Sequence, residues 1–389
     1  MSGRVVVIGG GIVGTSVAWH LACDLGWGGC VTVLERDPTL AQASTGRSAA
    51  GIRQQFTTAV NIRLSRYGLD FLRRFRTEEG EAVRLVENGY LILAGDAAQA
   101  AALGRAHALQ RAEGADVALL SPAELAARFP HLATGDLTLA SLGLSGEGWF
   151  DPVLLTAAMR RAAIAAGAAW QAAESAGIER GADGAVCGVR LTEGGTVSAD
   201  WVVLAAGVRA ARLGATADVA LPVEARKRTV FCIACAEPPA GRARLPLMVD
   251  PSGLWCRPEG AGFIAGRHPV PDPPAAPDDL EPRSHEFDSV IWPTLAGRGT
   301  CFEALRLTGL WAGHYAWNTH DQNAILGPAP GVPNLLLACG FSGHGVQQAP
   351  GVGRALAEWM VHGRYRTLDI AALHAERLTG APEVEGAVY

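Results

Sequence analysis

The sequence predicts a two-domain protein of mixed α/β and α+β architecture, with a Rossmann-type nucleotide-binding domain and a second domain built on an antiparallel sheet. Three observations predict this fold class. The chain opens with a strand, a glycine-rich turn, a helix and a second strand. Its middle carries a run of short strands with little helical pattern. At 389 residues, the chain is longer than a single hydrophobic core usually supports.

The opening elements follow from the spacing of apolar residues. Arg4–Ile8 is an apolar β-branched run, Val13–Leu25 has helical periodicity, and Val31–Leu34 predicts a second strand. Ser44–Phe56 is small and polar without a clear period, which is typical of a loop. Apolar residues recur about every 3.6 positions in Val60–Phe75, opposite a face of arginines, so a helix is predicted there.

Local signals predict the elements that follow. Ser121 is placed to cap a helix, and Pro152 lies in the first turn of another helix, where a missing N–H is tolerated. The C-terminal segment Thr379–Tyr389 is predicted to be frayed or dependent on a partner. The remaining predicted elements are, in order, a strand at Gly89–Ala94, helices at Ala97–Glu113, Pro122–Phe129 and Asp151–Ala166, strands at Val186–Thr192, Trp201–Ala205, Ala225–Ala236, Trp255–Arg257 and Gly262–Gly266, a loop at Pro269–Pro282, a strand at Leu335–Cys339 and a helix from about Val346 to His362.

The composition argues against several classes of function. The formal net charge is −5, and the 33 Lys and Arg residues are scattered rather than gathered in a run, so no nucleic acid partner is expected. The apolar run Val5–Ile8 is far shorter than a signal-peptide core or a membrane span. We therefore expect no transmembrane segment and a cytoplasmic location.

The eight cysteines are spread along the chain, which is typical of reduced thiols rather than of a disulfide framework. Cys232 and Cys235 form a CxxC motif inside the predicted strand Ala225–Ala236. Positions three apart in a strand point to opposite faces of the sheet. The pair is therefore predicted to pack in the core rather than to bind a metal, and no metal site is expected.

A dinucleotide-binding fingerprint lies between the first strand and the first helix. Gly9, Gly11 and Gly14 form GxGxxG in the strand-to-helix context that the motif requires. These glycines permit the turn, the approach of the backbone to a pyrophosphate, and close packing of helix on strand. Glu35 ends the second strand, where a carboxylate binds the ribose hydroxyls and disfavours the 2′-phosphate of NADP. The fingerprint alone leaves FAD and NAD open.

Three later segments decide between these cofactors by resemblance. Ser44–Arg53, the strand Trp201–Gly207 and the turn Gly340–Gly345 resemble the D-amino-acid oxidase and sarcosine oxidase family of FAD enzymes. The resemblance runs nearly end to end. It implies a glutathione-reductase-like FAD-binding domain assembled from residues 1–85, 146–220 and 326–389. It also implies a substrate domain, from residues 86–145 and 221–325, whose sheet covers the flavin.

The resemblance also implies which residues contact FAD, which is expected to be bound non-covalently. The glycines of the last turn admit the flavin ring, and the helix that follows directs its positive end toward the ring. The residues expected to contact FAD are Gly9, Gly11, Ile12, Val13, Gly14, Glu35, Arg36, Ser44, Thr45, Ser48, Ala49, Ala50, Gly51, Ala205, Ala206, Gly207, Gly340, Phe341, Ser342, Gly343, His344, Gly345, Val346 and Gln347.

The same resemblance implies a catalytic site. Arg53 matches an arginine that binds the substrate carboxylate, a task suited to a planar cation with paired donors. His314 takes the position of a cysteine that bonds covalently to FAD in some sarcosine oxidases, so a thioether link is not expected. Gln347 takes the position of a second cationic anchor for the carboxylate. The residues predicted for the catalytic site are Arg53, His268, His314, Tyr315, His344 and Gln347.

The function that follows is oxidation of the C–N bond of a small amine or amino acid by hydride transfer to FAD. The loss of the second cationic anchor leaves N-methyl amino acids, cyclic imino acids and D-amino acids open as substrates. Ile264 stands where sarcosine oxidases carry a lysine that promotes the reaction with oxygen, so a dehydrogenase is favoured over an oxidase. The electron acceptor is left open. The alternative is a flavin-bearing assembly or interaction protein in which FAD is chiefly structural.

Overall fold

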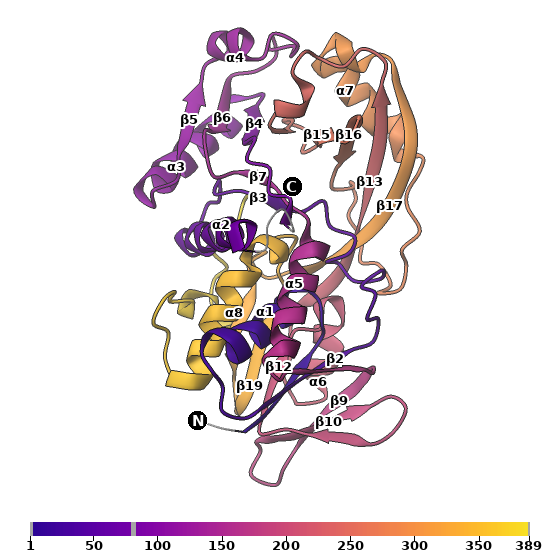
Figure 1. Ribbon diagram of the computed structural model, residues 1–389. Coiled ribbons are helices and arrows are strands. Elements are labelled where there is room, and N and C mark those ends of the chain that lie inside the picture. The colour runs from indigo at the N-terminus through magenta and orange to yellow at the C-terminus, as the bar shows by residue number, and fades with distance from the viewer. Residues whose placement is uncertain (1–2, 79–82, 388–389) are drawn as a thin grey trace.

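The computed structural model describes residues 3–78 and 83–387. Two large sheets organise the molecule, one in the lower half of Figure 1 and one in the upper half. The lower sheet takes strands from the beginning, the middle and the end of the chain, and the upper sheet takes strands from the two segments between them. The residue limits of the two predicted domains stay a prediction.

The lower sheet has six strands in the order β18-β19-β12-β1-β2-β8. Neighbouring strands are parallel except β18 and β19, which are antiparallel. Helices and a small sheet cover its two faces, which is why its central strands are continuous apolar runs. The strands are β1 (Arg4–Ile8), β2 (Cys30–Glu35), β8 (Ala169–Ala172), β12 (Trp201–Leu204), β18 (Ile325–Ala329) and β19 (Val332–Cys339).

Helices cover one face of the lower sheet, and α2 packs against α8 (Figure 1). These helices are α1 (Ile12–Trp19), which continues as a π-helical turn at His20–Asp24, α2 (Ala59–Glu78), α5 (Pro152–Ala165) and α8 (Gly345–His362). The other face packs against β9 (Ser175–Arg180), β10 (Val186–Leu191), β11 (Thr196–Ser198) and α6 (Ala210–Ala215).

The upper sheet has eight strands in the order β17-β13-β16-β15-β14-β4-β6-β5. Its pairs are antiparallel except β14 with β4. Its strands are β4 (Tyr90–Ala94), β5 (Val117–Leu120), β6 (Leu139–Gly143), β13 (Val223–Cys235), β14 (Leu247–Val249), β15 (Trp255–Glu259), β16 (Gly262–Gly266) and β17 (Leu305–Asn318).

The two faces of the upper sheet have different roles. One face packs under α4 (Pro122–Arg128) and α7 (Trp292–Arg298) in a closed core. The other carries a second apolar cluster that includes Val230, Trp255 and Ile264 and that reaches the main cavity of the molecule. Helix α3 (Ala97–Ala112) lies against β5 and β6. The short strands β3 (Gly51–Ile52) and β7 (Gly148–Trp149) pair with each other.

Most predicted elements are confirmed, with ends shifted by a few residues. The caps behave as predicted, since Ser121 and Glu124 form a capping box at α4. Cys232 and Cys235 contact the apolar clusters on opposite faces of the upper sheet, as the strand geometry predicted. The predicted loop Ser44–Phe56 was wrong at Gly51–Ile52, because the pairing partner of this short strand lies about a hundred residues away in the chain.

The prediction of a frayed C-terminus was wrong as far as Ala387. Glu385 and Ala387 are buried, and the carboxylate of Glu385 accepts hydrogen bonds from Thr57, Thr58 and Asn61. These partners lie more than three hundred residues away in sequence, so no local pattern reveals the contact. Residues 388–389 lie outside the described part of the chain. Within that part, no helix has the length and apolar character needed to cross a bilayer.

Glycines set how closely α1 approaches its neighbours. A Cβ at Gly14 would lie 2.0 Å from the carbonyl oxygen of Gly9, so Gly14 allows the close packing of helix on strand that the fingerprint predicted. A Cβ at Gly353 in α8 would lie 2.2 Å from Oγ of Ser16 and 2.7 Å from its carbonyl carbon. The contact between α1 and α8 therefore requires a residue without a side chain at position 353.

Gly353→Ala should destabilise the protein by roughly 1–3 kcal/mol, because the added methyl group must push the two helices apart. Gly104→Ala is the matched control, since Gly104 lies in α3 with no atom within 4 Å of an added Cβ. The control should stabilise by about 0.5–1 kcal/mol through helix propensity. Urea unfolding of both variants measures the difference. Equal effects of the two substitutions would contradict the described α1–α8 contact.

Candidate active site

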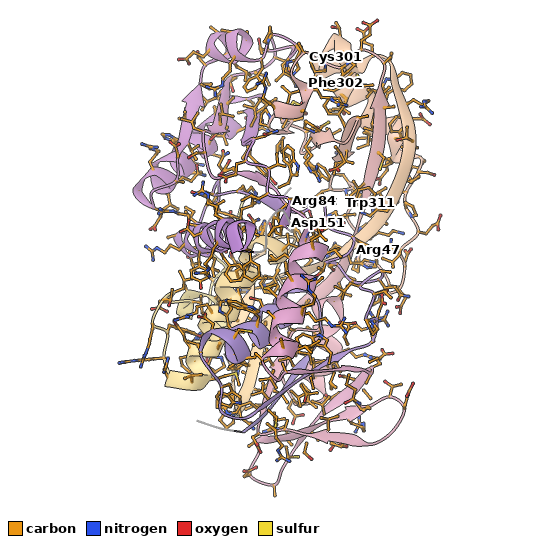
Figure 2. All side chains as sticks on the ribbon, viewed as in Figure 1. Arg47, Arg84, Asp151, Cys301, Phe302 and Trp311 are labelled. Atoms are coloured by element: carbon orange, nitrogen blue, oxygen red, sulfur yellow. The ribbon has the colours of Figure 1, made fainter. Side chains whose placement is uncertain are left out.

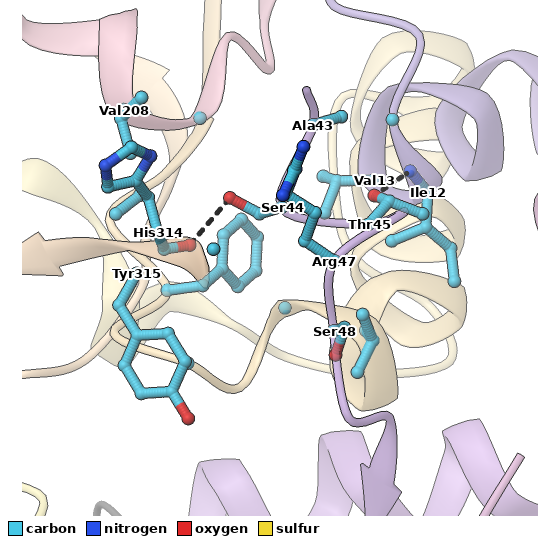
Figure 3. A pocket seen from close by; sticks show the side chains of 18 of the residues that line it. Ile12, Val13, Ala43, Ser44, Thr45, Arg47, Ser48, Val208, His314 and Tyr315 are labelled. Carbon is cyan, nitrogen blue, oxygen red and sulfur yellow. Dashed lines mark hydrogen bonds between the residues drawn. The ribbon is translucent and has the colours of Figure 1, made fainter. Parts of the chain in front are cut away.

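One cavity is lined by residues of the lower sheet and by residues of the upper sheet that include Val230 and Trp255; Figure 3 shows part of its wall. Its wall takes residues from the turn after β1, the end of β2, the loop before β3, the turn after β12, strands β13 and β17, and the start of α8. Most of the residues predicted from the sequence to contact FAD line this cavity. The structure therefore brings the GxGxxG fingerprint and the three later segments that resemble the FAD enzymes together around one cavity.

The fingerprint forms one end of the cavity. Gly9 has a φ of +105°, and a Cβ there would lie 2.4 Å from the carbonyl oxygen of Ala205, so only glycine suits this turn. An added Cβ at Gly11 would meet only Oγ1 of Thr45, at 3.1 Å, and would otherwise point into the cavity. The backbone at Gly11 is thus open to a close-lying group, as a pyrophosphate requires.

Glu35 is held in position at the end of β2. One of its carboxylate oxygens accepts a hydrogen bond from the N–H of Gly10 at 2.7 Å, and the other accepts from the N–H of Asp37 at 2.8 Å. Arg36 also lines the cavity and forms an ion pair with Asp278 at 3.2 Å. This end offers a carboxylate and a cation to a nucleoside.

The loop at residues 44–50 is fixed to the edge strand β17. Oγ of Ser44 donates to the carbonyl of His314 at 2.7 Å, and Oγ1 of Thr45 accepts from the N–H of Ile12 at 3.0 Å (Figure 3). Nε1 of Trp311 donates to the carbonyl of Arg47 at 2.9 Å (Figure 2). These bonds join both halves of the molecule across the cavity.

The turn before α8 forms the opposite end of the cavity. Gly343 has a φ of +99°, and a Cβ there would lie 2.5 Å from the ring of Tyr315, so this position requires glycine. Gly345, Val346 and Gln347 begin α8 and line the wall. The positive end of the helix dipole therefore faces the cavity and favours negative charge there.

Three residues predicted to contact FAD lie off the wall. Gly14 packs against the turn after β1, as described above. Gly340 packs against Val223 and Asn318, and Oγ of Ser342 accepts from the N–H of Asn318 at 2.9 Å. All three hold the shape of the turns rather than face the cavity.

Arg53 lies at the wall beside the start of α8, with 4% of its surface exposed. Its Nη1 donates to the carbonyl of Gln55 at 3.0 Å, and its Nη2 donates to the carbonyl of Ala387. Its guanidinium also lies over the ring of Phe56, 4.3 Å from the ring centre. A buried cation is thus held by carbonyls and an aromatic face.

Gln347 and His344 act on Arg53 directly. Oε1 of Gln347 accepts from the backbone N–H of Arg53 at 2.9 Å, so Gln347 fixes the main chain of the arginine rather than replacing a second cation. Nε2 of His344 lies 3.0 Å from Nη2 of Arg53 and must accept, because a guanidinium only donates. Burial and the neighbouring Arg53 lower the pKa of His344 well below its usual value. His344 is therefore neutral.

Tyr315 and His268 take different places. Tyr315 lines the cavity, and burial raises the pKa of its hydroxyl. His268 contacts Tyr315 and Trp317 edge-on, with ring centres 5.8 Å apart in both cases. Its predicted role in the catalytic site stays a prediction.

His314 lines the cavity next to Val208 (Figure 3). It is buried, and this burial lowers the pKa of its imidazole. Its Nε2 has no hydrogen-bond partner among the described residues. The ring is therefore neutral near pH 7, although a hydrogen bond to the backbone of Asp279 partly opposes the lowering of its pKa.

The sequence analysis missed several wall residues of the upper sheet. Arg228 is buried, pairs with both carboxylate oxygens of Asp272 at 2.7 Å, and lies 4.9 Å over the ring of Tyr315. Tyr90, Val230 and Trp255 form an apolar wall beside it. Arg228 follows Arg226 and Lys227 in the strand, so its charge alone does not distinguish it as a wall residue.

Comparisons with known proteins agree with this geometry. The family model described as DAO, FAD dependent oxidoreductase, matches residues 4–359. FAD-dependent oxidoreductase domain-containing protein 1 of Bos taurus is 37% identical, over 94% of this chain and 83% of that protein. Mitochondrial sarcosine dehydrogenase of Homo sapiens is 29% identical, over 93% of this chain and 40% of that protein.

Solved structures show the same fold. L-proline dehydrogenase from P. horikoshii superposes with a TM-score of 0.85 at 27% identity, over 97% of this chain and 98% of that chain. Glycine oxidase from Geobacillus kaustophilus superposes with a TM-score of 0.80 at 24% identity, over 96% of this chain and 98% of that chain.

The fold and the cavity define a flavoenzyme with two sheets around one cofactor site. The chain belongs to the DAO family of FAD-dependent oxidoreductases, and its cofactor is FAD. The residues present fit that cofactor, since the open backbone at Gly11 and the carboxylate of Glu35 suit its AMP half. The positive end of α8 also faces this cavity, where it would stabilise the negative charge of a reduced flavin ring.

Gly11→Val should lower the affinity for FAD by about 100-fold or more while leaving the fold intact, because the added side chain fills the space that the pyrophosphate needs. Bound FAD is measured by absorbance after desalting, and the fold is checked by circular dichroism. Gly104→Ala serves as the control and should keep a full complement of FAD. A folded Gly11→Val protein with normal FAD content would contradict the assignment of this turn.

Proposed function

We propose that the protein oxidises the C–N bond of a small amino acid or amine. The observation that carries the proposal is the buried guanidinium of Arg53 at the cavity wall, directly beside the N-terminus of α8. A cation at this place suits the carboxylate of an amino acid. The names of the relatives support the class of substrate, since they include a sarcosine dehydrogenase, an L-proline dehydrogenase and a glycine oxidase.

The chemistry follows from the cofactor and the shape of the site. Bound FAD supplies a two-electron acceptor for the hydride on the carbon next to the amine, which leaves an imine that water hydrolyses. The apolar wall of Tyr90, Val230 and Trp255 keeps water away from that carbon. Arg53 would hold the carboxylate, and its orientation would come from Gln347 and the carbonyl of Gln55.

The site favours a neutral amine. Hydride loss requires the nitrogen lone pair, so the substrate must bind without its ammonium proton. The buried cation of Arg53 disfavours a second positive charge nearby. The neutral His344 accepts from Arg53, so it is not placed to take the substrate proton. We assign no protein base to the reaction.

Reduction of FAD by substrate, followed under anaerobic conditions, tests this proposal. At least one compound in a panel of N-methyl, cyclic imino and D-amino acids should bleach the oxidised flavin band. Arg53→Ala should lower kcat/KM for that compound by roughly 10- to 1000-fold, the scale of a lost charge-assisted contact. Arg53→Lys should restore only part of the loss, because lysine cannot form the paired contact.

A flavin that no compound bleaches would favour the alternative, in which the protein serves in assembly and FAD is structural. Unchanged kinetics in Arg53→Ala would instead keep the enzyme and remove the carboxylate contact.

We further propose a dehydrogenase rather than an oxidase. Ile264 lies in the apolar cluster on the face of the upper sheet that reaches the cavity, together with the wall residues Val230 and Trp255. A neutral side chain there provides no charge to stabilise the anion formed as oxygen accepts its first electron. This environment supports a slow reaction with oxygen.

Stopped-flow reoxidation should therefore be faster with a quinone or dye than with oxygen. Ile264→Lys should speed the oxygen reaction, while Ile264→Met, a neutral control with an unbranched side chain nearly as long as that of lysine, should not. Oxygen reacting as fast as the best artificial acceptor in the unmodified protein would contradict the dehydrogenase assignment.

A further inference from the structure

Residues 383–387 form a segment, the C-terminal strap, that lies against the part of the chain following Arg53. The carbonyl of Glu383 accepts from Nδ2 of Asn323 at 3.0 Å, and the N–H of Glu385 donates to the carbonyl of Asp321 at 3.0 Å. The N–H of Gly386 donates to Oγ1 of Thr57 at 3.0 Å. The strap is thus tied both to the loop after β17 and to the segment that follows Arg53.

A buried carboxylate anchors the strap. The side chain of Glu385 accepts from the N–H and the hydroxyl of Thr57 at 2.9 and 2.6 Å. It also accepts from Thr58 and from Asn61, both at 2.9 Å. Glu385 has no exposed surface, and no ion pair to it is formed within residues 3–78 and 83–387. A buried carboxylate held by neutral donors gives a specific contact, since its loss leaves several donors without a partner.

The strap ends on the arginine of the proposed active site. Nη2 of Arg53 donates to the carbonyl of Ala387 and to Nε2 of His344. A guanidinium can bind a carboxylate in a bidentate manner through either of two edges, Nη1 with Nη2 or Nη2 with Nε. Both edges include Nη2. Neither edge can receive a substrate carboxylate while Ala387 and His344 occupy Nη2.

The strap and an anionic substrate therefore compete for the same donor. A carboxylate makes a stronger, charge-assisted hydrogen bond than a peptide carbonyl does. It can replace Ala387, whereas an amine without a carboxylate cannot. The contact thus favours substrates with an acid group.

We propose that the C-terminal strap is a displaceable gate that occupies the carboxylate-binding edge of Arg53, with Glu385 as its latch. This inference rests on the proposed function, because it assigns a carboxylate to Arg53. Opening the gate uses part of the binding free energy of the carboxylate. A weaker latch therefore raises the fraction of protein in which Arg53 is open to a carboxylate. The latch acts through Ala387 and Arg53, and Glu385 itself touches neither substrate nor FAD.

The test uses Glu385→Gln in the FAD-loaded full-length protein. The amide cannot accept all the hydrogen bonds of the carboxylate, so the strap should open more often. The oxidised protein should then bind acetate and pyrrole-2-carboxylate about 10-fold more tightly, as measured by the change in flavin absorbance. Amide hydrogen exchange in residues 383–387 should be faster in the variant. In the unmodified protein, exchange there should rise when acetate is added.

Glu383→Gln is the matched control, since this exposed side chain lies in the same strap and only the backbone carbonyl of Glu383 contacts Asn323. It should leave acetate affinity and exchange unchanged. Thr57→Val removes hydrogen bonds to Glu385 and Gly386 and provides a second, milder latch variant if Glu385→Gln fails to fold.

Unchanged or weaker acetate binding in a folded latch variant whose strap exchanges faster would overturn the gate. Faster exchange with tighter acetate binding would uphold the gate even if no amino acid reduced the flavin, and that result would instead count against the proposed function. Reduction of the flavin by amino acids, with acetate affinity unchanged in both latch variants, would keep the function and remove the gate.

Discussion

The burial of one guanidinium, that of Arg53, organises the substrate end of the molecule. A cation out of contact with water is tolerated only when acceptors surround it. Those acceptors come from segments far apart in the sequence, namely the carbonyls of Gln55 and Ala387 and the ring of His344. Because these acceptors surround Arg53, the loop after β3, the start of α8 and the C-terminal strap lie together.

A buried carboxyl group, that of Glu147, supports the position of Arg53. Both oxygens of Glu147 accept hydrogen bonds, from the N–H of Gln54 at 2.7 Å and from Nε2 of Gln55 at 2.8 Å. Burial raises the pKa of Glu147 to about 7. These donors hold the segment whose carbonyl binds Arg53, so the position of the arginine depends on strands β6 and β7, which flank Glu147. The binding end of the cavity is therefore set by the upper sheet as well as the lower one.

Local sequence signals predicted the parts of this fold that local geometry controls. The β1-α1-β2 unit, its glycines and Glu35 were readable because strand, turn and helix follow one another directly. The strand β17 was not readable, because glycines such as Gly309 and Gly313 interrupt its pattern and its stability comes from pairing with β13. The placement of Arg228 over Tyr315, the ring contact of His268 with Tyr315, and the burial of Glu385 depend on contacts between separate strands or over more than three hundred residues. The cytoplasmic location stays a prediction.

The proposed function depends on the binding of a substrate carboxylate to Arg53 inside the FAD cavity. A crystal structure of the oxidised, FAD-loaded protein with a saturating unreactive carboxylate, such as pyrrole-2-carboxylate, tests it most directly. We expect both carboxylate oxygens within hydrogen-bond distance of the Arg53 guanidinium, beside the ring of Tyr315. A ligand whose carboxylate lies elsewhere in the cavity, with the contacts of Arg53 to Gln55 and Ala387 intact, would contradict it.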